Sequence, residues 1–377
     1  MKVTNMSVAR ALQGVRVLDL SRLLPGPFLT MILADLGADV VKVEEPRRGD
    51  YMRDFPPRAN GASGRYLSVN RNKRSVTMDL KDDRERERFL HMAERADVVV
   101  ESFRPGVVDR LGVGWAALSE RNERIILCSI SGYGQTGPYR DRAGHDINYL
   151  ALAGVLGMSG QDPDGPPALA GVQIADLGGG AMWGAIAILA ALIDRNRTGR
   201  GAHLDISMTE GALAMLASEF GIVNAEPSPP TRGTGLLNGG AARYGVYRTS
   251  DGKYLSVGTL EPQFLNRLAE AAGLELRAGA EGDADLRRQL TRVIATKTRD
   301  EWARVLAGFD CCCEPVLELD EVPGHALHHE RGVFFEIPEE DGPRTLQVRT
   351  PLGMPAGRRR APKLGEHNKE VFREYGV

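Results

Sequence analysis

The stretch GVRVLDLSRLLPGPFLTMILADLGADVVKV, residues 14–43, decides the fold of this chain. Its first seven residues, 14–20, are mostly apolar and predict a buried strand, and the following Pro25-Gly-Pro27 interrupts the chain before an apolar helical run over residues 28–36. Gly37 is a typical helix end, and residues 39–43 predict a second strand. The stretch is therefore one strand–helix–strand unit, which is the repeating element of parallel sheets.

The same alternation continues along the chain. A helical pattern over residues 84–96 leads into a strand at 96–101, and residues 124–130 form another strand-like run. The apolar, Gly- and Ala-rich residues 177–195 predict a closely packed helix of a soluble protein rather than a membrane span, because charged residues close both ends. A strand at 203–207 follows, so we predict an α/β fold with a Rossmann-like parallel sheet.

Composition changes at residues 224–235, where Pro and Gly accumulate as in a linker. We predict three parts: a large Rossmann-like domain over residues 1–222, a small α+β domain over 223–332, and a C-terminal segment over 333–377 that returns to the large domain. The small domain opens with two strand-like runs within residues 243–257, joined by a Ser-Asp-Gly turn. A length of 377 residues fits two domains.

Charge and cysteine content exclude several function classes. The 48 basic and 50 acidic residues give a net charge of -2, so no global field favours nucleic acid or an anionic membrane. Cys128 and the consecutive Cys311, Cys312 and Cys313 contain no C-x-x-C pair, so we expect apolar packing rather than a disulfide or metal site. Residues 1–7 lack the apolar core of a signal peptide, and we expect a cytoplasmic protein.

Three basic features suggest a phosphate-rich ligand. They are Asn70-Arg-Asn-Lys-Arg-Ser75, the run Arg104-Pro-Gly106, and Arg110. Arginine forks bind phosphate oxygens in pairs and lysine adds a compact charge, so these residues can together hold a diphosphate. The alternative, that these charges are solvated surface groups, stays open on composition alone. No G-x-G-x-x-G or Walker-type loop competes for a phosphate.

Two proton-transfer candidates stand at loop-to-helix junctions. His145 lies in AGHDINY, residues 143–149, where Asp146 is a candidate helix cap, and Asp176 lies in QIADLGGG, residues 173–180. An imidazole and a carboxylate acting on one substrate atom indicate carbon-acid chemistry. Packing or capping also explains each residue taken alone. Glu261, in GTLEPQF at residues 258–264, precedes a helix that starts with proline and can be its cap.

With these motifs assembled, the chain resembles the family III CoA-transferase superfamily and, within it, most closely the α-methylacyl-CoA racemases. The resemblance rests on residues 14–20, 36–43, FRPG at 103–106, GYGQTGP at 132–138, residues 143–149, and EPQF at 261–264. It implies a large Rossmann-like domain, a small α+β domain, and a homodimer of two interlocked protomers. Glu261 of one protomer would then face His145 of the other.

The resemblance also implies an activity and its residues. The racemases transfer a proton at the carbon α to a thioester, with His145 and Asp176 as the acid/base pair and Glu261 assisting the histidine. The substrate is an acyl-CoA, so coenzyme A is part of the substrate and no cofactor is required. Backbone N–H groups near Asp176 are candidates for holding the enolate oxygen.

The resemblance further implies the residues that bind CoA and substrate. One departure concerns Glu44-Glu45-Pro46, where several racemases have a basic residue; Arg47 is the substitute expected here. The expected CoA and substrate residues are Arg47, Asn72, Lys73, Arg74, Met78, Asp79, Leu80, Lys81, Ser102, Phe103, Arg104, Arg110, Gly144, Asp146, Ile147, Asn148 and Tyr149.

Two other functions compete with racemisation. In a CoA-transferase, Asp176 would be a nucleophile that forms an acyl anhydride and then a CoA thioester. His145 and the EPQF run favour the racemase, and Asn238-Gly-Gly-Ala241 is not a full glycine-rich loop of the transferase type. A non-catalytic CoA-binding protein is disfavoured because His145, Asp176 and Glu261 are all present.

Overall fold

The computed structural model describes residues 8–59, 61–274, 283–339 and 342–377. They form two compact units. The larger unit comprises the residues up to Ala153, Val172–Ala217 and Leu327–Val377, and the smaller comprises Gly154–Gly171 and Ser218–Ala326. The predicted divisions after residues 222 and 332 lie close to these bounds. The excursion at Gly154–Gly171 was not predicted, because its Pro- and Gly-rich sequence is equally typical of a surface loop.

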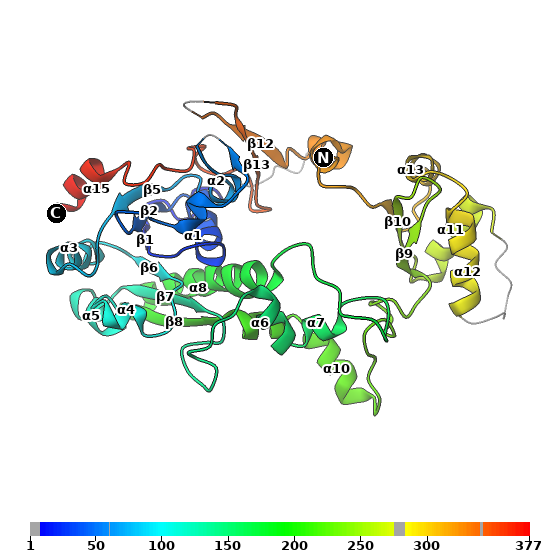
Figure 1. The fold of residues 1–377 in the computed structure, drawn as a ribbon, viewed down its shortest axis with the longest axis horizontal. Helices are drawn as coiled ribbons and strands as arrows, with labels where there is room; N and C mark the ends of the chain where they lie inside the picture. The colour runs from blue at the N-terminus through cyan, green and yellow to red at the C-terminus, as the bar shows by residue number, and fades with distance from the viewer. Residues whose placement is uncertain (1–7, 60, 275–282, 340–341) are drawn as a thin grey trace. The chain divides into compact units, whose positions relative to one another are not determined.

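A six-stranded parallel sheet is the centre of the larger unit (Figure 1). Its order is β5-β2-β1-β6-β7-β8, the Rossmann arrangement in which the chain runs outward from a central strand first to one side and then to the other. The α/β, Rossmann-like prediction is confirmed. The strands are β1 (Arg16–Asp19), β2 (Asp39–Glu44), β5 (Arg74–Thr77), β6 (Val98–Glu101), β7 (Ile126–Ser131) and β8 (Ala202–Ser207).

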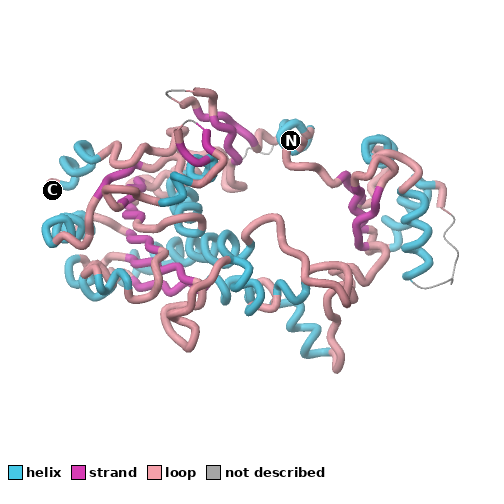
Figure 2. Tube along the Cα trace, in the orientation of Figure 1, coloured by secondary structure: helices cyan, strands magenta, loops and turns pink. Residues whose placement is uncertain are grey.

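Helices flank this sheet (Figure 2). Leu18, Val41 and Val99 are fully buried and pack against helices α3 and α5, whereas the alternate residue Asp19 accepts a hydrogen bond from Thr30 of α1. The helices of this unit are α1 (Pro25–Asp35), α2 (Gly64–Val69), α3 (Asp83–Ala93), α4 (Val107–Arg110), α5 (Trp115–Arg121), α6 (Asp146–Leu152), the π-helix η2 (Ala175–Met182), α8 (Trp183–Thr198), α9 (Met208–Ala214) and α15 (Asn368–Tyr375), with a short 3-10 turn η1 (Tyr51–Asp54).

The predicted apolar helix is a continuous segment made of η2 and α8. Ala175–Thr198 is long and apolar enough to cross a membrane by length and composition. Within the larger unit its small residues pack against α1, α9 and the sheet, and Gly184, Ala185, Ile188 and Leu192 are buried. The opposite face carries exposed apolar side chains.

The smaller unit has its own antiparallel sheet and core. The sheet has the order β11-β10-β9, and the fully buried Trp302 packs in a core with Leu255 and Leu290. This unit contains β9 (Tyr244–Arg248), β10 (Tyr254–Gly258), β11 (Cys313–Pro315), α7 (Val155–Met158), α10 (Ala217–Ala225), α11 (Pro262–Ala272), α12 (Asp283–Ile294), α13 (Arg299–Leu306) and η3 (Val322–Gly324), and α14 (Ala326–Glu330) leads out of it.

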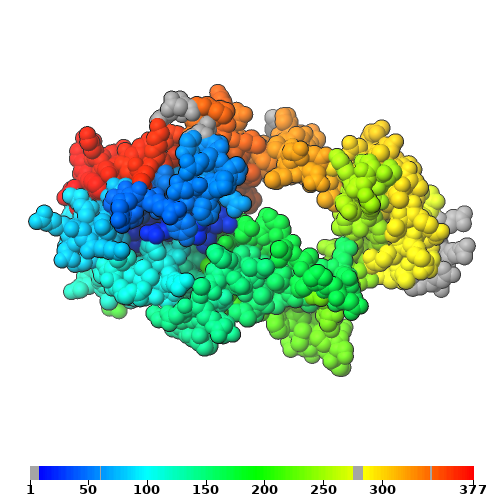
Figure 3. Space-filling model, in the orientation of Figure 1, coloured from blue at the N-terminus to red at the C-terminus, as the bar shows by residue number. Residues whose placement is uncertain are grey.

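The C-terminal segment covers the N-terminal part of the larger unit (Figure 3, orange and red against blue). Arg74 of β5 forms ion pairs with Glu370 and Glu374 of α15, at 2.8 and 2.6 Å. The segment also contains the hairpin β12 (Phe334–Ile337) and β13 (Thr345–Val348), and the chain has a second, two-residue hairpin of β3 (Arg58–Ala59) and β4 (Ala62–Ser63). The β12–β13 hairpin was not predicted, because scattered Pro and Gly masked its alternation.

A buried network of charges joins the ends of β1, β2 and β5. Lys42 pairs with Asp50 at 3.1 Å, Lys73 pairs with Asp19 at 3.2 Å, and all four side chains are fully buried. Burial alone would raise the pKa of Asp19, but Lys42 and Lys73 lower it to about 2. Because an ionised group without a partner is costly in the interior, the four charges depend on one another.

We expect Lys42→Met to destabilise the protein by about 3–5 kcal/mol, because it leaves Asp50 as a buried charge without its partner. Urea unfolding followed by circular dichroism measures this change. The matched control is Lys253→Met, whose pair with Glu321 is partly exposed and should contribute at most about 1 kcal/mol. Equal losses in the two variants would contradict the importance of the buried network.

Candidate active site

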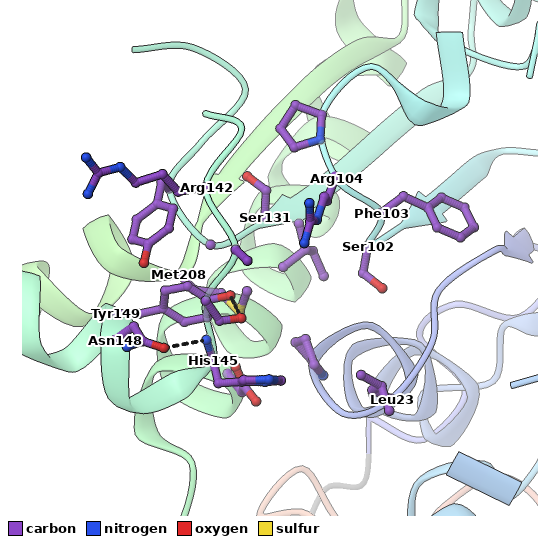
Figure 4. A pocket seen from close by; sticks show the side chains of 18 of the residues that line it. Leu23, Ser102, Phe103, Arg104, Ser131, Arg142, His145, Asn148, Tyr149 and Met208 are labelled. Atoms are coloured by element: carbon purple, nitrogen blue, oxygen red, sulfur yellow. Dashed lines mark hydrogen bonds between the residues drawn. The ribbon is translucent and has the colours of Figure 1, made fainter. Parts of the chain in front are cut away.

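A cavity of about 450 Å³ opens at the carboxyl ends of β1, β6, β7 and β8 (Figure 4). The order of strands reverses between β1 and β6, and ligands of open α/β sheets bind in the crevice at such a point. Each strand is followed within a few residues by part of the lining: Arg22 and Leu23 after β1, Ser102, Phe103 and Arg104 after β6, Gly132 and Tyr133 after β7, and Met208 after β8.

His145 lies in this cavity as the residue before α6 (Figure 4). Its backbone N–H donates to Asn148 Oδ1 at 3.0 Å, which starts the helix, and its imidazole is exposed to the cavity. The Tyr149 hydroxyl donates to the Gly144 carbonyl at 2.6 Å, and burial raises the pKa of Tyr149, so this donor stays protonated. A side chain at Gly144 would collide with the Tyr149 ring, so glycine is required beside the histidine.

Asp176 lines the same cavity from the first turn of η2. Its backbone N–H donates to Asp146 Oδ1 at 3.0 Å, which brings two carboxylates close together. Burial, and next the charge of Asp146, raise the pKa of Asp176 to about 7. Asp176 can therefore exchange a proton near neutral pH, which an ordinary aspartate cannot do.

The π-helix that carries Asp176 is fixed by close contact with α9. A Cβ atom on Gly211 of α9 would lie 2.1 Å from the carbonyl oxygen of Gly179, so the two backbones touch directly. Short π-helical segments are frequently found at functional sites. The glycines of η2, from which the sequence predicted close packing, therefore help to set the position of the Asp176 carboxylate.

One expectation about these helix ends was wrong. Asp146 does not cap its own helix; its carboxylate accepts from the N–H of Asp176 instead. Two of the N–H groups near Asp176 already have acceptors, because that of Asp176 is bound to Asp146 and that of Leu177 donates to Gln173 O at 3.0 Å. In the described part of the chain, the N–H groups of Asp146 and Ile147 have no acceptor, since the first intrahelical bond begins at Asn148.

Arginine side chains make the cavity basic. Arg22, Arg104, Arg140 and Arg142 line it, and the guanidinium groups of Arg140 and Arg110 both lie against Gly106. Arg140 pairs with Asp141, and Arg142 lies 3.9 Å above the ring of Tyr139. Such an arrangement fits an anionic ligand with several charges.

The remaining predicted ligand residues lie elsewhere. Asn72, Lys73 and Arg74 are buried and bound to Asp35, Asp19 and Asp39, which favours a structural role over a phosphate contact. Met78 is part of the core, and Arg47 is exposed and paired with Glu45. Asp79, Leu80, Lys81, Arg110, Asp146 and Ile147 are not part of the cavity lining, and Leu80 packs against the core.

Glu261 belongs to the smaller unit, where it precedes α11 as the expected cap residue. Its side chain makes no cap hydrogen bond, and it is exposed.

The sequence missed part of the cavity: Arg22, Leu23, Tyr51, Arg140, Arg142 and Met208. A signal existed for Arg22, Leu23 and Met208, because they follow strands, and residues at the carboxyl ends of parallel strands line ligand crevices. Tyr51 begins the short 3-10 turn η1, and Arg140 and Arg142 come from a loop; no periodicity predicts the course of such segments.

Comparison with known proteins identifies the family of this fold and site. The human alpha-methylacyl-CoA racemase is 38% identical over 377 residues, covering 97% of this chain and 94% of the human protein. A succinate–glutarate CoA-transferase of Agrobacterium fabrum is 35% identical over 388 residues, covering 96% and 95%. The crystal structure of a CAIB/BAIF family protein from Brucella suis is 30% identical with a TM-score of 0.85, covering 97% of this chain and 99% of that one.

The family model for CoA-transferase family III matches residues 12–368. This match spans nearly the whole chain, both units included. The chain therefore belongs to the CoA-transferase family III, a family of enzymes that includes racemases and CoA-transferases.

Proposed function

We propose that the protein is a racemase that inverts the α-carbon of 2-methylacyl-CoA thioesters by 1,1-proton transfer. The observation that carries this proposal is that His145 and Asp176 line one cavity. The similarity to the human racemase supports the same assignment. A pKa of about 7 for Asp176 suits a group that must both accept and donate a proton at neutral pH.

In the proposed reaction, one of the two groups removes the α-proton and the other returns a proton to the same carbon from the opposite face. The first step leaves an enolate, whose charge develops on the thioester oxygen.

The arginine-rich lining supports an acyl-CoA ligand. Arg104 and Arg110 are the residues we assign to the phosphates of coenzyme A, with Arg140 beside them. Gly144, Asn148 and Tyr149 lie in the cavity beside His145, where the thioester end would be. Proton transfer between side chains and substrate needs no cofactor in this proposal, and CoA enters only as part of the substrate.

Transfer of CoA between carboxylic acids is the second candidate, supported by the similarity to the Agrobacterium transferase. Asp176 would then attack the thioester carbonyl and release CoA thiolate, which would attack the resulting anhydride to give an aspartyl-CoA thioester and the free acid. Asp176 lies in the cavity as this chemistry requires, but the reaction has no role for the imidazole of His145.

A single incubation distinguishes the two reactions. In deuterated water, a (2R)-2-methylacyl-CoA should lose chirality at C2 and gain one deuterium there. Mass spectrometry measures the deuterium, and chiral chromatography measures the loss of chirality. His145→Ala should lower the exchange rate by about 10²–10⁴-fold, because a general acid/base is lost. If the wild type shows no exchange and moves CoA to a free acid, the racemase assignment is wrong and the CoA-transferase assignment takes its place.

The charge of Asp146 should add to the effect of burial on the pH dependence. We expect kcat/KM to show an inflection near pH 7 from Asp176, and Asp146→Asn to move it to lower pH, because removing a neighbouring negative charge lowers the pKa. Asparagine keeps the oxygen that accepts from the Asp176 N–H.

Two further variants accompany this measurement. Asp146→Ala should also lower kcat because it removes the acceptor, and Asp164→Asn, an exposed change in the smaller unit, should alter neither quantity. An unchanged inflection in Asp146→Asn would contradict the coupling of the two carboxylates.

We further propose that the active form is an interlocked homodimer in which Glu261 of the partner assists His145. Helix α8 supports an association of this kind. Met182, the last residue of η2, is 50% exposed, and Trp183, Ile186 and Ile193 of α8 are 42%, 55% and 73% exposed. The four side chains recur at helical spacing on one face. Exposed apolar stripes of this kind are typical of protein interfaces.

A charge on this face should separate the protomers. We expect Ile186→Glu to convert dimers into monomers in size-exclusion chromatography with light scattering, and racemisation to fall with the dimer fraction. Ala116→Glu places the same charge on the exposed side of α5 and should leave the dimer intact. If Ile186→Glu remains dimeric, the proposal that α8 forms the interface is wrong.

A further inference from the structure

The loop between β1 and α1 places an arginine in the cavity that no other part of the proposed mechanism uses. Arg22 lines the cavity and is half-buried, and its guanidinium carbon lies 5.1 Å above the ring centre of Phe103. Within the residues that the structure describes, no carboxylate forms an ion pair with it. By contrast, Arg140 is paired with a neighbouring aspartate.

The backbone of this loop is held by side chains from three other elements. The Arg22 N–H donates to Ser102 Oγ at 3.1 Å, and the Leu23 N–H donates to Asp50 Oδ1 at 3.2 Å. Lys42 Nζ donates to the carbonyl of Ser21 at 2.8 Å. The loop therefore has little freedom to move Arg22 out of the cavity.

The loop also contains backbone strain. Leu23 has a φ angle of 63°, in the left-handed region that a leucine rarely adopts. Strain of this kind costs of order 1–3 kcal/mol and persists where the surroundings impose it, most often at ligand sites. Here it accompanies the buried charges Lys42 and Asp50, and the result is a fixed position for the preceding arginine.

A half-buried guanidinium without a counter-charge has lost part of its hydration. The Phe103 ring offsets some of this loss through a cation–π contact. A single arginine fork matches one carboxylate, with two parallel hydrogen bonds. A diphosphate is matched better by grouped cations such as Arg110 and Arg140, which meet at Gly106.

We propose that Arg22 is a specificity-determining residue that binds a carboxylate on the acyl group of the substrate. The inference rests on the proposed binding of acyl-CoA in this cavity and narrows the substrate class to acyl-CoA thioesters with an acidic acyl chain. Phe103 and Leu23 contact the aliphatic part of that chain, and the Arg22 guanidinium takes the place of water around its anionic end.

Binding measured by isothermal titration calorimetry tests the assignment independently of turnover. The probes are succinyl-CoA, butyryl-CoA, which has a methyl group in place of the carboxylate, and CoA itself. The wild type should bind succinyl-CoA at least about tenfold more tightly than butyryl-CoA, since a charged hydrogen-bonded pair is gained. Arg22→Met should abolish this difference and leave the affinity for CoA unchanged.

Two control variants complete the test. Arg22→Lys should keep part of the preference, and Arg197→Met, which removes an exposed arginine on α8, should keep all of it. Thermal unfolding by circular dichroism checks that Arg22→Met is folded.

Three outcomes overturn the assignment, and they are distinguishable. Equal wild-type affinity for succinyl-CoA and butyryl-CoA refutes the carboxylate contact alone. A similar loss of affinity for CoA and succinyl-CoA in Arg22→Met assigns the arginine to a phosphate instead. Failure of all three probes to bind the wild type refutes the proposed function, and the Arg22 assignment with it.

Discussion

The parallel pairing of β1 with β2 on one side and β6 on the other is the constraint on which the rest of the structure depends. A central strand that the chain leaves first in one direction and then in the other separates the loops at its carboxyl end, and this opens a crevice. The βα loops after β1 and β6 both line the cavity and contact each other there. The strand order therefore determines where the crevice lies, whichever side chains line it.

A buried ion pair holds the loop that lines the crevice in place. Lys42 and Asp50 are fully buried, and both bind the backbone of the β1–α1 loop. Replacing such a pair by apolar residues is often neutral for stability, so its value here is positional: it imposes a conformation that Leu23 would not adopt alone. The interior of the protein thus specifies the direction of an arginine on its surface.

The position of Asp176, half of the proposed acid/base pair, depends on contacts between segments distant in sequence. Asp146 accepts the N–H of Asp176 across 30 positions of the chain. Burial raises the pKa of Asp176, and the charge that this contact places beside it raises the pKa further. The backbone of Gly211 in α9 contacts that of Gly179 in the π-helix, and this contact holds the helix that carries Asp176 in place. Position and protonation of Asp176 are consequently set by the same packing.

The sequence by itself determined the strand–helix alternation, the parallel sheet and the identity of His145 and Asp176, because periodicity, glycine and proline are local signals. Only the tertiary structure decided which polar groups face a ligand. In the structure, Asn72, Lys73 and Arg74 are buried and bound to aspartates, and Arg22 lines the cavity. The Asp146 carboxylate accepts the N–H of Asp176 in η2 and does not cap its own helix. The physical reason is that a charged side chain takes its role from partners that are remote in sequence, and composition contains no record of those partners.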